Sequence, residues 1–185
     1  HLEKTNDIVA SYNALWQDKY GADVLQHGIE PYKNNIPKVP QVTVKVPTAG
    51  GKTFIAANAL NVIFRHFDLD KPKAVVWLVP SITILEQTIR NLSDVKHPYR
   101  QKLNAHFSSK VEIYKKEDLL QGANFDPISV KDQLSIFVLS FDSLRTKNKE
   151  GRKFYQENGA LASFAELNLN KEIVLEGSDE TSLIN

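Results

Sequence analysis

Apolar residues in the N-terminal third of the chain recur at the spacing of helices with one apolar face. A first helix is predicted from Asp7 to Lys19, with the apolar positions Ile8, Tyr12, Leu15 and Trp16. A second helix is predicted to begin near Lys52 and to end before Pro72, with apolar residues at i, i+4, i+7 and i+11: Ala56, Leu60, Ile63 and Phe67. The stretch between the two helices is rich in glycine and proline and is expected to form turns.

Other segments carry the patterns of β-strands. Gln41 to Val46 (QVTVKV) is strand-like, and Ala74 to Val79 (AVVWLV) and Leu134 to Ser140 (LSIFVLS) are continuous apolar runs. Such runs are typical of parallel strands that are buried on both faces. Val111 and Ile113 predict a further short strand with alternating polarity.

Helices are predicted between these strands. One is capped by Ser81 and has the apolar face Ile82, Leu85, Ile89 and Leu92, and Lys116 to Leu120 is expected to form a helical turn. Strand and helix signals therefore alternate. This order indicates an α/β domain with a mainly parallel sheet flanked by helices, which binds ligands beyond the carboxyl ends of its strands. Residues 1–40 are predicted to form an N-terminal helix and approach segment, and residues 41–185 a single, incomplete domain.

Composition narrows the class of protein. The chain has 185 residues, of which 42% are hydrophobic, so it is long enough for one domain with a buried core. Its formal charge of +1 decides little about a nucleic-acid partner. It has no cysteine, which excludes disulfides and thiolate metal sites, and its five histidines show no spacing of metal ligands. No membrane span or signal peptide is predicted, and a cytoplasmic location is expected.

The run Val-Pro-Thr-Ala-Gly-Gly-Lys-Thr from Val46 to Thr53 has the residue types of a phosphate-binding loop. Small residues let successive backbone N–H groups curl around a polyphosphate, the Lys52 charge meets the terminal phosphates, and the Thr53 hydroxyl reaches Mg²⁺. Val46 stands where the strict pattern has its first glycine, and Ala49 where glycine is frequent. The alternative is a glycine-rich turn with a solvated lysine. The predicted nucleotide contacts are Pro47, Thr48, Ala49, Gly50, Gly51, Lys52 and Thr53.

Three segments occur in order along the chain: VPTAGGKT, VVWLVPSITILEQTIRNL and FVLSFDSLRTKNKEGRKFYQENG. Together they resemble the first RecA-like motor domain of superfamily 2 helicases, and within it the Res subunit of type III restriction enzymes. The resemblance runs from about Val42 to the C-terminus. It implies a RecA-like P-loop NTPase fold whose first segment binds ATP and Mg²⁺, with Lys52 and Thr53 as catalytic residues and Thr53 as the metal contact.

The other two segments of the resemblance imply a strip that contacts nucleic acid. Its residues in this chain would be Pro80, Ser81, Ser140, Phe141, Asp142 and the basic residues Arg145, Lys147, Lys149, Arg152 and Lys153. Each has a structural alternative. Pro80 and Ser81 can end a strand and cap a helix, Asp142 and Ser143 can cap the next helix, and the basic run can be a solvated loop.

An ATPase of this type also needs a Walker B carboxylate at the end of a buried strand. Asp179 and Glu180 are not preceded directly by a strand-like run, so we expect the chain to stop just upstream of this motif and to be inactive alone. The nuclease domain of the resembled proteins is likewise expected beyond Asn185. The resemblance also implies an adenine-contacting glutamine upstream of the loop, for which Gln17 and Gln26 are candidates.

The function predicted from these features is the N-terminal ATP-binding lobe of a DNA-dependent ATPase and translocase from a type III restriction–modification enzyme. The predicted partners are duplex DNA and, through the parent protein, a modification methyltransferase subunit. One alternative is another P-loop enzyme such as a small-molecule kinase, which would need a complete acceptor site within this length. Another alternative is a nucleotide-responsive DNA-binding module.

Overall fold

The computed structural model of the chain describes residues 4, 6–21, 28–36, 39–66, 72–121, 125–144 and 163–164. The chain divides into two compact units, His1–Gly51 and Lys52–Asn185. The first contains helix α2 (Ile8–Tyr20), which confirms the first predicted helix to within one residue at each end. The Asp7 carboxylate caps α2 by accepting a hydrogen bond from the Ala10 N–H at 2.9 Å. The helix ends at Gly21, whose φ of 67° favours glycine.

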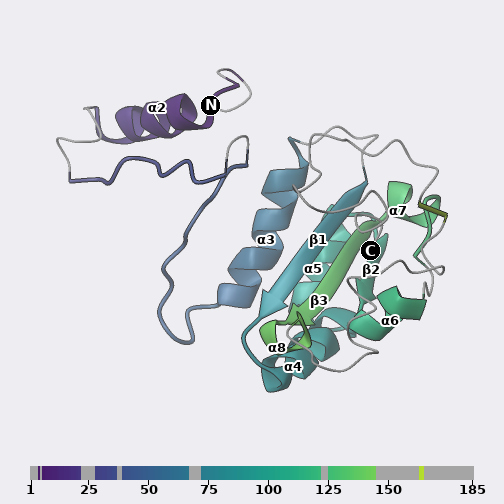
Figure 1. The fold of residues 1–185 in the computed structure, drawn as a ribbon. Helices are drawn as coiled ribbons and strands as arrows, with labels where there is room; N and C mark the ends of the chain where they lie inside the picture. Colours follow the sequence, from purple (N-terminus) through teal and green to yellow (C-terminus); the bar gives the residue numbers. More distant parts are fainter. Residues whose placement is uncertain are drawn as a thin grey trace. The chain divides into compact units, whose positions relative to one another are not determined.

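The second unit is built on a parallel sheet. Its described strands are β1 (Lys73–Val79), β2 (Val111–Tyr114) and β3 (Leu134–Ser140), in the spatial order β1-β3-β2 (Figure 1). β3 pairs in parallel with both neighbours, and all seven of its residues are buried. The α/β fold with a parallel sheet that the sequence predicts is therefore confirmed.

Six described helices accompany this sheet: α3 (Lys52–Phe64), α4 (Ile82–Ser93), α5 (Pro98–His106), α6 (Lys116–Gln121), α7 (Ser129–Asp132) and α8 (Phe141–Leu144). Side chains from three of these helices and from the strands form one buried core cluster: Ala57, Phe64, Leu92, Leu103, Val111, Leu134, Ile136 and Val138. α4 contacts all three strands and α5. The apolar core thus joins the helical layer to the central strand, as expected for an α/β domain.

Helices α3 and α5 lie side by side and run in the same direction. The rings of Phe54 and Tyr99, near the two N-termini, are 6.3 Å apart, and those of Phe64 and Phe107, at the two C-terminal ends, are 6.0 Å apart. α3 leads into β1 and α5 into β2, and these strands are parallel. Each helix therefore runs from the carboxyl end of the sheet back to its amino end.

Arg100 of α5 connects three elements of the second unit. Its guanidinium donates hydrogen bonds to the carbonyl of Leu92 in α4 at 3.1 Å and to that of Val111 in β2 at 2.7 Å. Its Nε also donates to the Asn104 side chain at 2.9 Å. Desolvation on partial burial lowers the pKa of Arg100. These bonds hold the end of α4 against the start of β2.

The predicted strand Gln41–Val46 is not formed, which corrects that expectation. The segment has no regular secondary structure, and Val42 and Val44 are 85% and 63% exposed. A strand needs a backbone partner and a packed face. Among the described residues, the sheet ladders join only β1, β2 and β3, so this segment has neither source of stability.

Two predicted faces also need correction. In α3 the buried residues are Ala57 and Phe64, whereas Ile63 is 49% exposed, because α3 packs against α5 through the neighbouring face. β1 is not buried on both sides: Val75 packs against the core while Val76 is 64% exposed. β1 has a paired neighbour on one side only within the described sheet.

Candidate nucleotide-binding site

The predicted phosphate-binding loop forms a tight turn. The Gly50 N–H donates a hydrogen bond to the Pro47 carbonyl at 3.0 Å. Ala49 and Gly51 have positive φ angles of 61° and 73°, while that of Gly50 between them is not positive. When residues with positive and negative φ angles alternate, successive N–H groups point toward one side of the chain. Together they form a concave surface that suits an anion. The loop residues therefore have a backbone that fits a phosphate group.

The backbone at Gly50 leaves no room for a side chain. A Cβ there would lie 2.7 Å from Cγ1 of Val46 and 3.0 Å from the Pro47 carbonyl oxygen. Ala49, in contrast, tolerates its left-handed conformation at a cost on the order of 1–2 kcal/mol. A glycine is thus required at position 50 by close approach, and position 49 carries strain that a glycine would remove.

The chain passes directly from this turn into α3, which begins at Lys52. The Lys52 side chain is exposed and Thr53 is half-buried in the first helical turn. The N-terminus of an α-helix carries a partial positive charge and N–H groups without partners in the helix, which favour an anion. Figure 1 shows that α3 begins at the same end of the sheet as the arrowheads of β1 and β3. Lys52 and Thr53 therefore lie at the carboxyl end of the sheet.

The structure brings two predicted nucleic-acid segments together at that end. Val79, the last residue of β1, is paired with Ser140, the last residue of β3. Pro80 and Ser81 therefore leave the sheet beside Phe141. Ser81 caps α4, since its hydroxyl accepts a hydrogen bond from the Ile84 N–H at 3.4 Å.

The exposure of these residues differs. Pro80, Phe141 and Asp142 are exposed, whereas Ser140 is fully buried. The alternative role of Asp142 as a helix cap is wrong, because α8 begins at Phe141 and Asp142 lies within its first turn. Of the predicted strip, Pro80, Phe141 and Asp142 thus present surface at the carboxyl end of the sheet.

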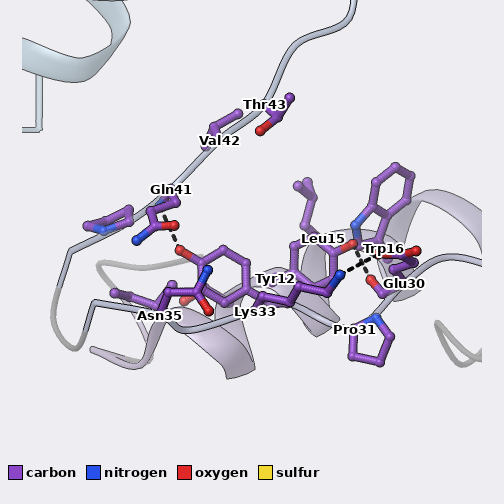
Figure 2. A pocket seen from close by; sticks show the side chains of 14 residues that line it. Tyr12, Leu15, Trp16, Glu30, Pro31, Lys33, Asn35, Gln41, Val42 and Thr43 are labelled. Atoms are coloured by element: carbon purple, nitrogen blue, oxygen red, sulfur yellow. Dashed lines mark hydrogen bonds and ion pairs between the residues drawn. The ribbon is translucent and has the colours of Figure 1, made fainter.

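Several predicted residues lie outside the described part of the chain. They are Arg145, Lys147, Lys149, Arg152, Lys153, Gln26, Asp179 and Glu180. Gln17, the other candidate for adenine contact, is an exposed residue of α2 and does not line a pocket described for this unit (Figure 2).

No group of three or more His, Cys, Asp or Glu residues that could hold a metal ion occurs in the described ranges.

Sequence reasoning missed a charged hollow near the carboxyl end of β2. Arg90 of α4 and Lys115 and Lys116 after β2 line a cavity of about 500 Å³, together with the carboxylates Glu86 and Glu117. Two consecutive lysines directly after a predicted strand were the available signal. The mixture of charges gives this hollow no strong preference for an anion.

The parallel sheet, its flanking helices and the glycine-rich turn before α3 are the features of an α/β domain of the P-loop class. A family model described as "Type III restriction enzyme, res subunit" matches residues 14–168, which is most of the chain. The chain therefore belongs to this family, whose members are helicase-like ATPases with a RecA-like P-loop fold. Neither the curated proteins nor the solved structures include a significant match to it. In the described residues, no helix has the length and apolar character that a membrane span requires.

The geometry of the turn predicts opposite effects for two small substitutions. Gly50→Ala should weaken ATP–Mg²⁺ binding by tenfold or more, because its Cβ must displace Val46 or the Pro47 carbonyl. Ala49→Gly should leave the affinity unchanged or improve it, since it removes the left-handed strain. Isothermal titration calorimetry measures both affinities, and circular dichroism checks that both variants fold. Equal affinities for Gly50→Ala and the parent chain would show that the turn does not bind the nucleotide.

Proposed function

We propose that this chain is the ATP-binding lobe of a DNA-dependent ATPase that translocates on duplex DNA within a type III restriction–modification enzyme. The observation that carries the proposal is the turn with left-handed residues at Ala49 and Gly51, which leads directly into α3 at Lys52. The family match over residues 14–168 supports the same function. A modification methyltransferase subunit is the proposed partner of the parent protein.

In this proposal the loop binds the β- and γ-phosphates of ATP. Backbone N–H groups around Gly51 and the start of α3 donate to phosphate oxygens, and Lys52 neutralises charge on the terminal phosphate. Thr53 supplies one hydroxyl to Mg²⁺. Chemistry of this kind depends on positioning and charge stabilisation, and movement along DNA depends on closure of a second lobe on the nucleotide.

The first prediction concerns Lys52. Lys52→Ala should weaken ATP–Mg²⁺ binding by at least tenfold, because a charge-assisted hydrogen bond contributes about 1.5–3 kcal/mol. Lys45→Ala is the matched control, since this exposed lysine precedes the loop and should leave the affinity unchanged. Calorimetry on the folded variants gives both values. A parent-like affinity for Lys52→Ala would refute the assignment of the loop.

The second prediction concerns turnover. The described strands end before Pro80, Lys115 and Phe141, so none of them is followed directly by an acidic pair that could complete Mg²⁺ coordination. We propose that this 185-residue chain binds ATP without hydrolysing it, with or without DNA. A phosphate-release assay tests this. DNA-stimulated turnover that Lys52→Ala abolishes would contradict it, and transfer to a small-molecule acceptor would favour the kinase alternative.

The third prediction concerns DNA. The proposed DNA contacts go to phosphates and come from Pro80, Phe141 and the basic residues after α8. DNA binding should therefore be weak, independent of sequence and strongly dependent on salt. Neutralising three phosphate contacts by Lys147→Gln, Lys149→Gln and Lys153→Gln should reduce the slope of log affinity against log salt by up to about 2.7. Fluorescence anisotropy with unrelated duplexes across a salt series measures this slope.

The matched control for this experiment neutralises three exposed lysines outside the predicted strip. The variant Lys96→Gln, Lys102→Gln and Lys131→Gln changes the net charge by the same amount. If both triple variants lose the same affinity, only net charge matters and the basic run has no special role. If neither differs from the parent chain, DNA is bound elsewhere or not at all.

A further inference from the structure

An aromatic contact lies directly beside the residues that are proposed to bind phosphate and Mg²⁺. Phe54 follows Lys52 and Thr53 in the first turn of α3, and its ring lies 6.3 Å from that of Tyr99 in α5. Rings whose centroids are about 4.5–7 Å apart attract each other beyond the effect of burying their area. Because Phe54 is 39% exposed, this contact is an important restraint on its side chain. Both rings belong to the second unit.

The position of Tyr99 is itself determined by hydrogen bonds. Its backbone N–H donates at 3.3 Å to Nδ1 of His97, the cap of α5, and the rings of these two residues lie 4.4 Å apart. The next residue, Arg100, donates to carbonyls of α4 and of β2. The Tyr99 side chain also packs against the apolar core. Hydrogen bonds that do not involve α3 therefore fix the residue on which Phe54 packs.

The first turn of α3 has little stability of its own. It begins with Lys52 and contains no acidic residue. Since the N-terminus of a helix carries a partial positive charge, a cation there is unfavourable until an anion binds. Helix ends also fray, because their first N–H groups have no partner within the helix. Before a nucleotide binds, this turn therefore tends to open, and the contact between Phe54 and Tyr99 opposes the opening.

We propose that Tyr99 is a positioning residue for the nucleotide. Through Phe54 it holds the first turn of α3 folded, so that Lys52 and Thr53 are in place before the phosphates arrive. The apparent affinity for a ligand falls in proportion to the fraction of molecules in the binding-competent conformation. Loss of the Tyr99 ring lowers this fraction. The inference rests on the proposed function, because it gives Tyr99 a part in phosphate binding by α3.

Nucleotide affinity is the first test. Tyr99→Leu should weaken binding of ADP–Mg²⁺ by about two- to tenfold, as expected from the contribution of one aromatic pair. Tyr99→Phe keeps the ring and should bind like the parent chain. The matched control is Phe107→Leu, which removes the ring contact with Phe64, 6.0 Å away at the other ends of α3 and α5. This control should lower the stability of the fold and leave the affinity unchanged.

A double-mutant cycle tests whether Tyr99 acts through Phe54. Phe54→Leu should weaken binding as Tyr99→Leu does, and the double variant should bind no more weakly than either, because each change removes the same contact. Calorimetry gives the affinities, and circular dichroism shows that the variants fold. Additive losses would show that the two residues act separately and would overturn the proposal. An equal loss in Phe107→Leu would also overturn it, because general destabilisation would then explain the effect.

Amide hydrogen exchange provides a readout that needs no nucleotide. The N–H groups of Ala56 and Ala57 bond to carbonyls of the first turn of α3. In Tyr99→Leu these two amides should exchange faster relative to the rest of the helix, whereas Phe107→Leu should act on amides near Phe64 instead. A uniform change along α3 would contradict the proposal.

The two levels of the account fail in different ways. If Tyr99→Leu keeps the parent's affinity while Lys52→Ala loses it, Tyr99 has no positioning role and the loop assignment stands. If Lys52→Ala also binds like the parent chain, the proposed function fails. The exchange rates in the first turn of α3 then still decide whether Tyr99 holds that turn.

Discussion

Parallel pairing of β3 with β1 on one side and β2 on the other is the interaction on which the second unit depends. Because all seven residues of β3 are buried, its position in the centre of the sheet is strongly determined. The pairing of Val79 with Ser140 then aligns the carboxyl ends of β1 and β3. Since α3 and α5 both run back from that end, the start of α3 lies there too. Lys52, Pro80 and Phe141, far apart in the sequence, are thereby placed at one end of one sheet.

Sequence patterns predicted the elements whose signal comes from burial or from a local cap. The apolar run at Leu134 to Ser140 became β3, and Ser81 caps α4 as expected. α5 was missed because its sequence, PYRQKLNAH, has few apolar residues; it is defined by Pro98 in its first turn and by the His97 ring, which accepts from the Tyr99 N–H at 3.3 Å. The buried face of α3 could not be read from its sequence either. Nine of the thirteen residues of α3 are apolar and they lie on more than one face, so contact with α5 selects Ala57 and Phe64 over Ile63.

At the candidate site too, the sequence predicted the features that depend on local residue types and missed those that depend on tertiary contacts. The residue types from Pro47 to Thr53 predicted a phosphate-binding loop, and the backbone angles at Ala49 and Gly51 fit that function. The strand expected before the loop was wrong, because a strand depends on a neighbour that sequence periodicity does not supply. A pocket of the first unit, which Tyr12, Trp16 and Tyr32 line, was also missed. Tyr32 lies sixteen residues beyond Trp16 in the sequence, and sequence periodicity does not show that both line one cavity.

Amide resonances test the central claim, that the turn before α3 binds phosphate, most directly. In ¹H–¹⁵N NMR spectra titrated with ADP and Mg²⁺, the largest shifts are expected at the N–H groups of Gly50, Gly51, Lys52 and Thr53, because these would lie nearest the bound phosphates. Pyrophosphate should shift the same four amides, since it carries the phosphate groups without the base. If ADP binds while these four resonances stay in place, the phosphates are bound elsewhere and the loop is only a glycine-rich turn.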